Sequence, residues 1–361
     1  MVIMVIRSQG KRLLVGASAS LLGAALFVST TSGVASAQPI AESYHVVSTW
    51  DSVGPTPHFS GVDARLHKVF VSNLAAGTVT VLNSETGALI STIPLGGTVH
   101  TVAVDQQNQR VYVTDIQRGR LDVINARTDA VIAEIPVAAH LHGLVVSQRL
   151  HEAFVTDISL SKVYAIDIKN DKVIDPAGIS VGPNPWGVSV NPRTKTLYVA
   201  NTGIDPYAGT THNSQSINAA GNSVSVINLR TMSVITTVTV GPHPWNVIAD
   251  PQNGLVYVGV SAANEVAVLQ HNRVVDDIPV GDSPHGVVID YRNHTLLVNN
   301  SISDTVSVIN TSSNEVTQTI SVGTQPQGIS VDQHTGEAYV VNQASATVTV
   351  LKPLRTLNQD A

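Results

Sequence analysis

The chain contains no cysteine. It therefore forms no disulfide, no thiolate metal site and no cysteine nucleophile, and its stability must come from packing alone. Charged residues are also scarce, at 13% of 361 residues, and the long helix formers Lys, Glu and Arg give way to Val, Thr, Ser, Asn and Gly. This composition favours strands and tight turns over helices.

Several catalytic signatures are absent as well. The sequence has no Gly-x-Ser-x-Gly elbow, no phosphate-binding loop and no repeated acidic calcium loop. No spacing suggests a Ser-His-Asp triad, and none excludes one. The sequence therefore identifies no particular catalytic reaction.

The first 37 residues read as a signal peptide. Three basic side chains lie between residues 7 and 12, an apolar run follows over Leu13–Val28, and Ala35–Ala37 gives a small-x-small cleavage pattern before Gln38. The apolar run is short for a bilayer span, although an uncleaved anchor is the alternative. We expect an exported protein that is periplasmic, secreted or attached to the cell surface, with no membrane span after removal of the signal.

The remaining chain is acidic. Residues 1–37 hold three of the 20 basic residues and none of the 26 acidic ones, which leaves 17 basic side chains and a formal charge of −9. This charge argues against nucleic acid or an anionic membrane as a partner. We expect a monomer whose partner is a small molecule, a glycan or a protein.

One motif returns along the whole chain about every 42 residues, which marks a repeat protein. It reads Val-Gly-Pro-Asn-Pro-Trp-Gly-Val at 181–188, and close copies lie at 240–247, 280–287 and 322–329, with looser ones beginning at Val53, Gly96 and Ala138. Within a unit, four short alternating segments are separated by turn residues, for example 101–105, 110–115, 121–125 and 130–137. Four such strands are typical of one propeller blade.

Seven units predict an all-β, seven-bladed β-propeller over residues 44–351. The units begin near Gly54, Gly96, Ala138, Gly182, Gly241, Gly281 and Gly323. The last unit lacks its outer strand, and Tyr44–Val53 resembles the missing piece. We expect the N-terminal strand to complete the last blade and close the ring, leaving 352–361 as a tail.

The strand motifs resemble the Tyr-Val-Thr-Asn repeat. They read Val-Tyr-Val-Thr-Asp at 111–115, Leu-Tyr-Val-Ala-Asn at 197–201, Ala-Tyr-Val-Val-Asn at 338–342 and Ser-Val-Ser-Val-Ile-Asn at 223–228. That family comprises seven-bladed propellers of bacterial and archaeal envelopes, within the wider group of WD40-like repeats. The resemblance implies a fold and an envelope location, and it implies no particular chemistry.

Aligning the units places seven side chains at one equivalent position, the start of each innermost strand. They are His58, His100, His142, Trp186, Trp245, His285 and Gln327. Innermost strands converge, so we expect these side chains to ring the channel mouth. Clustered neutral imidazoles suit Cu or Zn, which makes the four histidines candidate metal ligands. The alternative is that this position only needs a flat, hydrogen-bonding side chain that plugs the channel.

Two further features fall on the same face. Asp115 and Asp157 end second strands where most units have Asn, so they either support His100 and His142 as metal ligands or simply cap the turn. The fourth unit carries about 17 extra residues within 202–222, including Tyr207 and His212. This segment is either a lid with those two contacts or a tolerated surface insertion.

Three functions remain open at this stage. The first is a binding protein that uses Trp186, Trp245, Gln327, Tyr207 and His212, because flat aromatics suit a sugar, a peptide side chain or a planar ligand. The second is a metal-dependent enzyme built on the four histidines. The third is a structural protein of the cell envelope.

Overall fold

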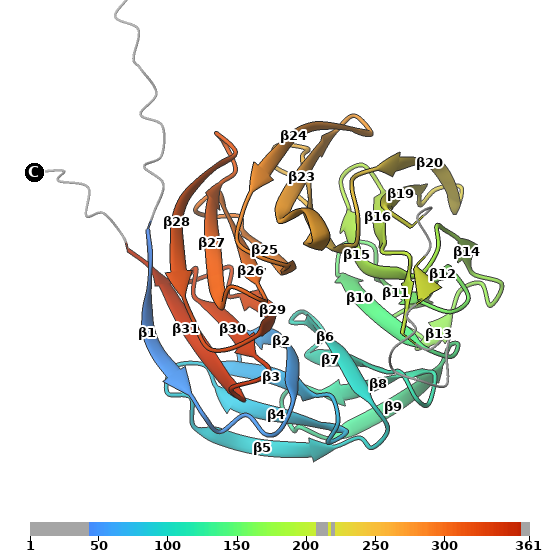
Figure 1. Ribbon diagram of the computed structural model, residues 1–361. Coiled ribbons are helices and arrows are strands. Elements are labelled where there is room, and N and C mark those ends of the chain that lie inside the picture. Colours follow the sequence, from blue (N-terminus) through green and yellow to red (C-terminus); the bar gives the residue numbers. More distant parts are fainter. Residues whose placement is uncertain (1–42, 207–215, 218–220, 355–361) are drawn as a thin grey trace, which may run out of the picture. The chain divides into compact units, whose positions relative to one another are not determined.

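A computed structural model describes residues 43–206, 216–217 and 221–354. These residues form eight antiparallel sheets, of which seven are blades around a central channel and the eighth is a two-stranded hairpin (Figure 1). The prediction of an all-β, seven-bladed propeller is confirmed. The one helical element among them is a short 3-10 turn, Ser261–Ala263, and no helix there is long and apolar enough to cross a bilayer.

The strands follow the chain from the channel outwards within each blade. Blade one contains β2 (Pro57–Asp63), β3 (Lys68–Asn73), β4 (Thr78–Asn83) and β5 (Leu89–Pro94). Blade two contains β6 (Val99–Asp105), β7 (Arg110–Asp115), β8 (Arg120–Asn125) and β9 (Val131–Pro136). Blade three contains β10 (Leu141–Ser147), β11 (Glu152–Asp157), β12 (Lys162–Asp167), β13 (Lys172–Val173) and β14 (Ile179–Ser180). The outer strand of blade three is thus split in two, because a turn containing Pro176 and Gly178 interrupts it.

The fourth blade carries the insertion. It contains β15 (Pro185–Asn191), β16 (Thr196–Asn201), β19 (Ser223–Asn228) and β20 (Ser233–Thr239), with the small hairpin β17 (Ile204–Asp205) and β18 (Ser216–Ile217) between its second and third strands. Blade five contains β21 (Pro244–Ala249), β22 (Val256–Val260), β23 (Glu265–Gln270) and β24 (Arg273–Pro279). Blade six contains β25 (Pro284–Asp290), β26 (Thr295–Asn300), β27 (Thr305–Asn310) and β28 (Glu315–Ser321).

The seventh blade joins the two ends of the propeller. It contains β29 (Pro326–Val331), β30 (Ala338–Asn342), β31 (Thr347–Pro353) and, as its outer strand, β1 (Tyr44–Trp50). Strand β1 pairs antiparallel with β31, so the blue and red ends of the chain lie side by side in Figure 1. A hydroxyl contact of 2.8 Å between Ser60 and Ser330 links blade seven to blade one. The expected closure by the N-terminal strand is therefore present.

Apolar side chains fill the spaces between neighbouring blades. The described residues form seven hydrophobic clusters, and each joins two adjacent sheets. The cluster that joins blades seven and one, for example, contains Trp50, Val69, Val71 and Tyr339, all buried. A single blade cannot bury both faces of its sheet, so the ring arrangement supplies the core.

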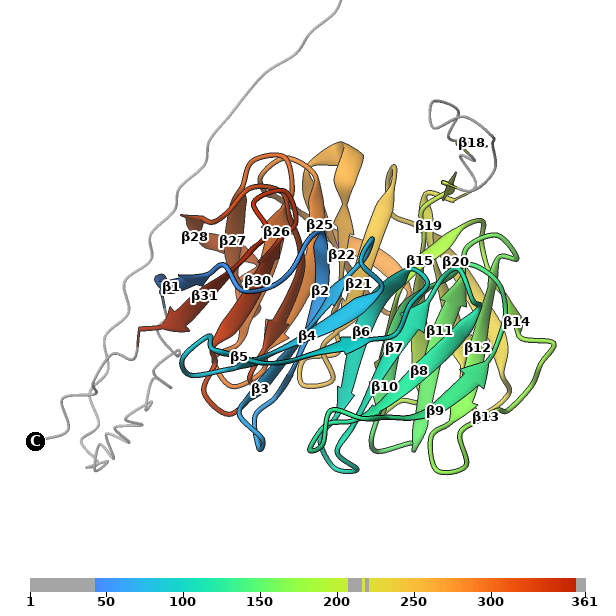
Figure 2. The ribbon, with the colours of Figure 1, turned by 90° about the horizontal axis from the view of Figure 1, so that it is seen from below.

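The two ends of the channel carry different loops. In all seven blades, the residue after the second strand donates a backbone hydrogen bond to the loop before the first strand, as Leu74 does to the Thr56 carbonyl at 3.0 Å. These loops therefore share one face, here called the insertion face because β17 and β18 project from it (Figure 2). The tight turns between first and second strands, which contain His67, His151 and His294, lie at the other end.

Candidate functional site

A β-bulge sets the direction of each channel residue. In every blade, the pairing of the first and second strands shifts register at the position that the repeat alignment singled out. In blade one, for example, the shift lies between Pro57 and Ser60 and takes His58 and Phe59 out of the ladder. A bulge re-aims the side chains that it frees. Seven equivalent bulges therefore turn seven side chains toward the channel.

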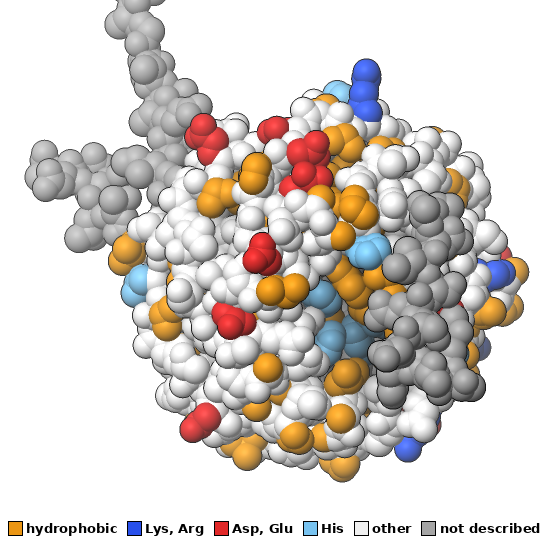
Figure 3. Space-filling model, viewed as in Figure 1, with side chains coloured by type: hydrophobic (Ala, Val, Ile, Leu, Met, Phe, Trp, Pro, Cys, Tyr) orange, Lys and Arg blue, Asp and Glu red, His pale blue; other side chains and the backbone are white. Residues whose placement is uncertain are grey.

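The structure brings the six aromatic members of this set into one continuous arc. These six side chains and Gln327 are here called the channel-mouth ring. Successive ring centroids lie 4.3, 3.6, 3.8, 4.0 and 5.0 Å apart in the order His58, His100, His142, Trp186, Trp245 and His285. Gln327 completes the ring and donates from Nε2 to the Ser301 hydroxyl at 2.9 Å. Figure 3 shows histidine and hydrophobic side chains gathered at the centre of the insertion face.

Side chains on the second strands fix part of this ring. Thr156 donates its hydroxyl to the Trp186 carbonyl of the next blade at 2.8 Å, and Thr114 does the same to the His142 carbonyl at 3.3 Å. The Ser72 hydroxyl bonds the His100 carbonyl, and Asn299 bonds the carbonyl of Gln327. The equivalent positions in blades four, five and seven are Ala200, Gly259 and Val341, whose side chains have no donor.

The ring histidines are uncharged at neutral pH. All four are at most 8% exposed, and burial lowers the pKa of His58 to about 3 and that of His285 to about 4. Burial, and then the neighbouring imidazoles, also holds the pKa values of His100 and His142 well below the usual 6.5. The buried Nδ1 atoms of His58 and His285 have no hydrogen-bond partner within the part of the chain that the structure describes. A proton on either atom would therefore be poorly stabilised.

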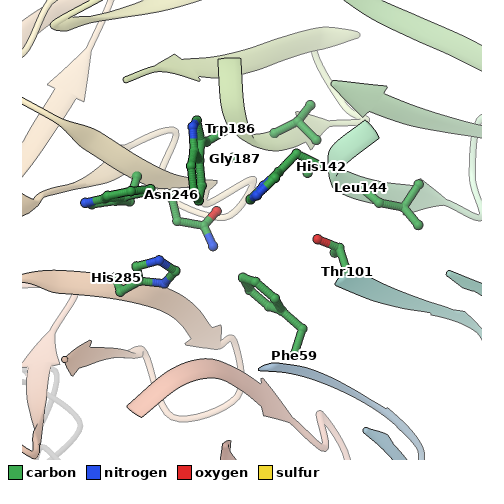
Figure 4. Close-up of a pocket in the computed structure, with 11 residues that line it drawn as sticks. Phe59, Thr101, His142, Leu144, Trp186, Gly187, Asn246 and His285 are labelled. Atoms are coloured by element: carbon green, nitrogen blue, oxygen red, sulfur yellow. The ribbon is translucent and has the colours of Figure 1, made fainter. Parts of the chain in front are cut away.

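A cavity of about 50 Å³ opens beside the ring, on the side of the two tryptophans. It is lined by Phe59, Thr101, His142, Gly143, Leu144, Trp186, Gly187, Val188, Trp245, Asn246 and His285 (Figure 4). One water needs at least about 10–15 Å³ on this measure, so the 50 Å³ cavity has room for roughly four water-sized groups. None of these described lining residues is charged at neutral pH, since the two imidazoles are neutral.

Seven of these lining residues were not identified from the sequence, and three of the seven break a pattern of the repeat: Phe59, Thr101 and Asn246. Each follows a ring residue, at the position where the other four blades have glycine. Glycine is needed there because the next blade approaches closely: a Cβ on Gly143 would lie 1.9 Å from the Trp186 carbonyl oxygen. A non-glycine residue must instead direct its side chain into the cavity, as Figure 4 shows for Asn246. The break in the glycine pattern was the available signal.

Asp115 and Asp157 have local partners. Asp115 accepts hydrogen bonds from the amides of Thr98 and Arg118, and Asp157 accepts one from the Leu160 amide at 2.8 Å. These are the bonds of turn caps, the second of the two roles considered above. Neither carboxylate makes a hydrogen bond or ion pair with a ring histidine among the described residues, so no contact supports a role in orienting His100 or His142.

The insertion reaches the ring through its first residues. The indole N–H of Trp186 donates to the Ile204 carbonyl in β17 at 3.5 Å, and the Gly203 amide bonds the Pro183 carbonyl. The insertion therefore rises from the face that holds the cavity, as expected. Tyr207 and His212 lie outside the described residues, and their role as ligand contacts stays a prediction.

The metal prediction receives no geometric support. Within residues 43–206, 216–217 and 221–354, no group of three or more His, Cys, Asp or Glu side chains is arranged to hold a metal ion. His100 and His142 lie with their ring centroids 3.6 Å apart, and the Nδ1 of His100 is within 3.0 Å of the Thr101 hydroxyl. The assignment of Cu or Zn to His58, His100, His142 and His285 stays untested.

Comparison with known proteins supports the fold alone. No protein-family model and no curated protein matches the chain. Among solved structures, the chain is similar to one described as Kuenenia stuttgartiensis hydrazine synthase, with a TM-score of 0.69 and 16% sequence identity over 85% of this chain and 97% of that one. At this identity the likeness extends to the architecture and to nothing chemical. The chain is a seven-bladed β-propeller.

Proposed function

We propose that this chain is a binding protein that takes a small ligand at the channel-mouth ring. One observation carries the proposal: rings from five different blades enclose a single cavity of about 50 Å³. Concave, mostly apolar cavities with a few directed polar groups are the usual form of a ligand site. Here the polar groups are Thr101 and Asn246, at positions where the fold itself prefers glycine.

We also propose that the protein is exported and belongs with the Tyr-Val-Thr-Asn repeat propellers. The basic and apolar segments before Ala35–Ala37 support export, and the first residue of the mature protein, expected to be Gln38, tests it. The hydroxyl at the Thr position of the repeat supports the family, because Thr114 and Thr156 link neighbouring blades through it.

The binding proposal is tested by a thermal-shift screen of the full chain against small cationic, neutral and anionic compounds and short glycans. A true ligand at about 100 times its Kd adds roughly 2.7 kcal/mol of stability, which raises Tm by several degrees. We expect Trp186→Ala and Trp245→Ala to abolish the shift. His151→Gln, in an exposed turn at the other end of the channel, is the matched control and should keep it.

Three results would contradict binding of a small ligand at the channel-mouth ring. A shift that persists in both tryptophan variants would place the ligand outside the ring. Stoichiometric Cu or Zn in the purified protein, lost in the double variant His100→Ala/His142→Ala, would favour the metal-dependent enzyme. If no compound and no metal binds, the structural role in the envelope is the reading that survives.

A further inference from the structure

The cavity at the channel mouth is a cage of aromatic and imidazole rings. Phe59, His142, Trp186, Trp245 and His285 come from blades one, three, four, five and six, and all five line the same space (Figure 4). Their surroundings differ in one respect from an ordinary core: they meet around a cavity instead of filling it. The shape and charge of that cavity limit what can occupy it.

Neighbouring rings of the cage are inclined to one another. Trp186 lies at 84° to Trp245 and at 52° to His142, while His285 is tilted by 33° from Trp245 and by 42° from Phe59. None of these four pairs is parallel, so a planar ligand cannot lie flat against both rings of such a pair. A compact, rounded group can touch every ring at once.

The volume of the cavity also limits its occupant. A cavity of about 50 Å³ has room for roughly four water-sized groups, so only a small, compact head group can be seated in it. A whole sugar ring exceeds it. The ligand group that enters the cavity is therefore a small head, and the rest of the ligand must extend toward the insertion face.

The hydrogen-bonding groups of the lining further limit the kind of cation that can bind in the cavity. The Thr101 hydroxyl already contacts the Nδ1 of His100 at 3.0 Å, and the Asn246 Oδ1 accepts from the Val247 amide at 2.9 Å. A primary ammonium brings three N–H donors, and among the described lining residues the buried acceptor atom without a partner is the Nδ1 of His285. Some of its donors would therefore stay unsatisfied, which is costly in a buried site. A quaternary ammonium has no N–H group to satisfy.

The charge of the lining selects the sign of the ligand. Among the described residues no Lys, Arg, Asp or Glu lines the cavity, and the imidazoles are neutral at pH 7, so an anion would meet no cation there. The faces of aromatic rings are negative, and they attract a cation most strongly when water is excluded. Trp186 and Trp245 have the strongest such faces among the side chains present.

We infer that the cage formed by Phe59, His142, Trp186, Trp245 and His285 binds a small quaternary ammonium group, such as the trimethylammonium head of choline or glycine betaine. This inference rests on the proposed function and names its ligand class. Choline and glycine betaine share the head group and differ in the substituent that extends toward the insertion face.

The test is calorimetric titration of the full chain at pH 7 with tetramethylammonium chloride, choline, glycine betaine and 3,3-dimethylbutan-1-ol. The last compound has the shape of choline without its charge. We expect choline to bind at least about tenfold more tightly than this neutral isostere, a difference of about 1.4 kcal/mol, because only the cation is attracted by the aromatic faces. The tighter of choline and glycine betaine then identifies the source of the head group.

Matched variants locate the cation. Trp186→Phe keeps an aromatic face and should retain binding within a few fold, whereas Trp186→Leu keeps an apolar side chain without that face and should weaken it at least about tenfold. His151→Gln, at the other end of the channel, should change nothing. Because the isostere comparison uses the unmodified chain, it decides the question even if a tryptophan variant fails to fold.

The inference and the proposed function fail separately. If no quaternary ammonium binds, or the neutral isostere binds equally well, the cage does not select a cation. Binding of another compound that depends on Trp186 and Trp245 would then leave the proposed function standing. If nothing in the broader screen binds the full chain, both are wrong.

Discussion

At the scale of single residues, the side chains that link blades and the side chains that line the channel mouth occupy different positions of the repeat. The Thr position of the motif links blades, as Thr156 does by donating to the Trp186 carbonyl. The ring position that it holds is free to vary, since His, Trp and Gln all occur there. The same backbone therefore presents different side chains to the channel without changing the fold. Blades five and six present Trp245 and His285 without this hydroxyl link.

The buried histidines make stability depend on pH in a predictable direction. His285 has a pKa of about 4 in the folded protein, against 6.5 for an ordinary histidine, so between these values the unfolded chain binds more protons. Its contribution to stability is therefore complete above pH 6.5 and is lost as pH falls toward 4. Each such histidine adds about 1.4 kcal/mol per pH unit to the slope in that window.

His285→Gln tests this linkage. Gln327 occupies the equivalent position in blade seven, so glutamine suits the fold. We expect the free energy of unfolding, measured in urea at pH 7, 5.5 and 4.5, to fall less steeply in the variant by about 1.4 kcal/mol per pH unit. His151→Gln is the control, because Gln109 fills the equivalent turn of blade two. Equal slopes in His285→Gln and the unmodified chain would show that His285 is not buried as a neutral group.

At the scale of strands, blade two departs from its neighbours. In blade one, Asn73 donates from Nδ2 to the hydroxyls of Thr78 and Thr80 at 3.0 and 2.8 Å, and three other blades repeat this network. Blade two has Asp115, Arg120 and Asp122 at these positions. Arg120 lies 3.0 Å from the Asp122 carboxylate and 4.0 Å from that of Asp115, and both carboxylates are fully buried. Burial raises the pKa of Asp122 to about 6.

Substitutions in this cluster should differ sharply in effect. Arg120→Thr alone leaves the buried carboxylate of Asp122 without a cation, while Asp115 keeps Arg118 at 3.8 Å, and we expect the change to cost about 3–5 kcal/mol of unfolding free energy at pH 7. The triple variant Asp115→Asn/Arg120→Thr/Asp122→Thr rebuilds the neutral network of blade one and should stay within about 1 kcal/mol of the unmodified chain. Denaturant unfolding at pH 7 measures both. A triple variant as unstable as the single one would contradict this account of the cluster.

The strands were largely predictable from the sequence because every blade repeats the same spacing. Strand β7 occupies Arg110–Asp115 as expected, and β30 occupies Ala338–Asn342. Boundaries differ where a bulge or proline acts: β6 begins at Val99, two residues before the apolar segment that predicted it, and the outer strand of blade three is split near Pro176. The pattern of apolar residues does not report these local effects.

The site was predictable as a set of positions and not as a cavity. The alignment found all seven ring positions, because equivalent residues of a repeat meet at the channel. It could not show that Asp115 and Asp157 bond turn amides, since Asp and Asn suit the same turn. Nor did it find Phe59, Thr101 and Asn246. Their significance appears only when the close approach of the next blade shows why glycine is the ordinary residue there.

At the scale of the whole molecule, the cavity exists only because the ring closes. Its lining begins at Phe59 in blade one and ends at His285 in blade six, and blade one is held in place through blade seven. Strand β1 supplies the outer edge of that last blade, with the Tyr44 hydroxyl 2.7 Å from the Asp290 carboxylate of blade six. A seven-bladed propeller fixes such a site geometrically, while the fold itself does not decide its ligand.

A crystal structure of the full chain with tetramethylarsonium would locate a bound cation in the propeller, because this cation has the shape of tetramethylammonium and its arsenic gives an anomalous signal. We expect one arsenic peak in the cavity bounded by Trp186, Trp245 and His285, with the rings tilted around it. An arsenic peak elsewhere on the propeller, or an empty cavity in crystals grown at saturating cation, would contradict it.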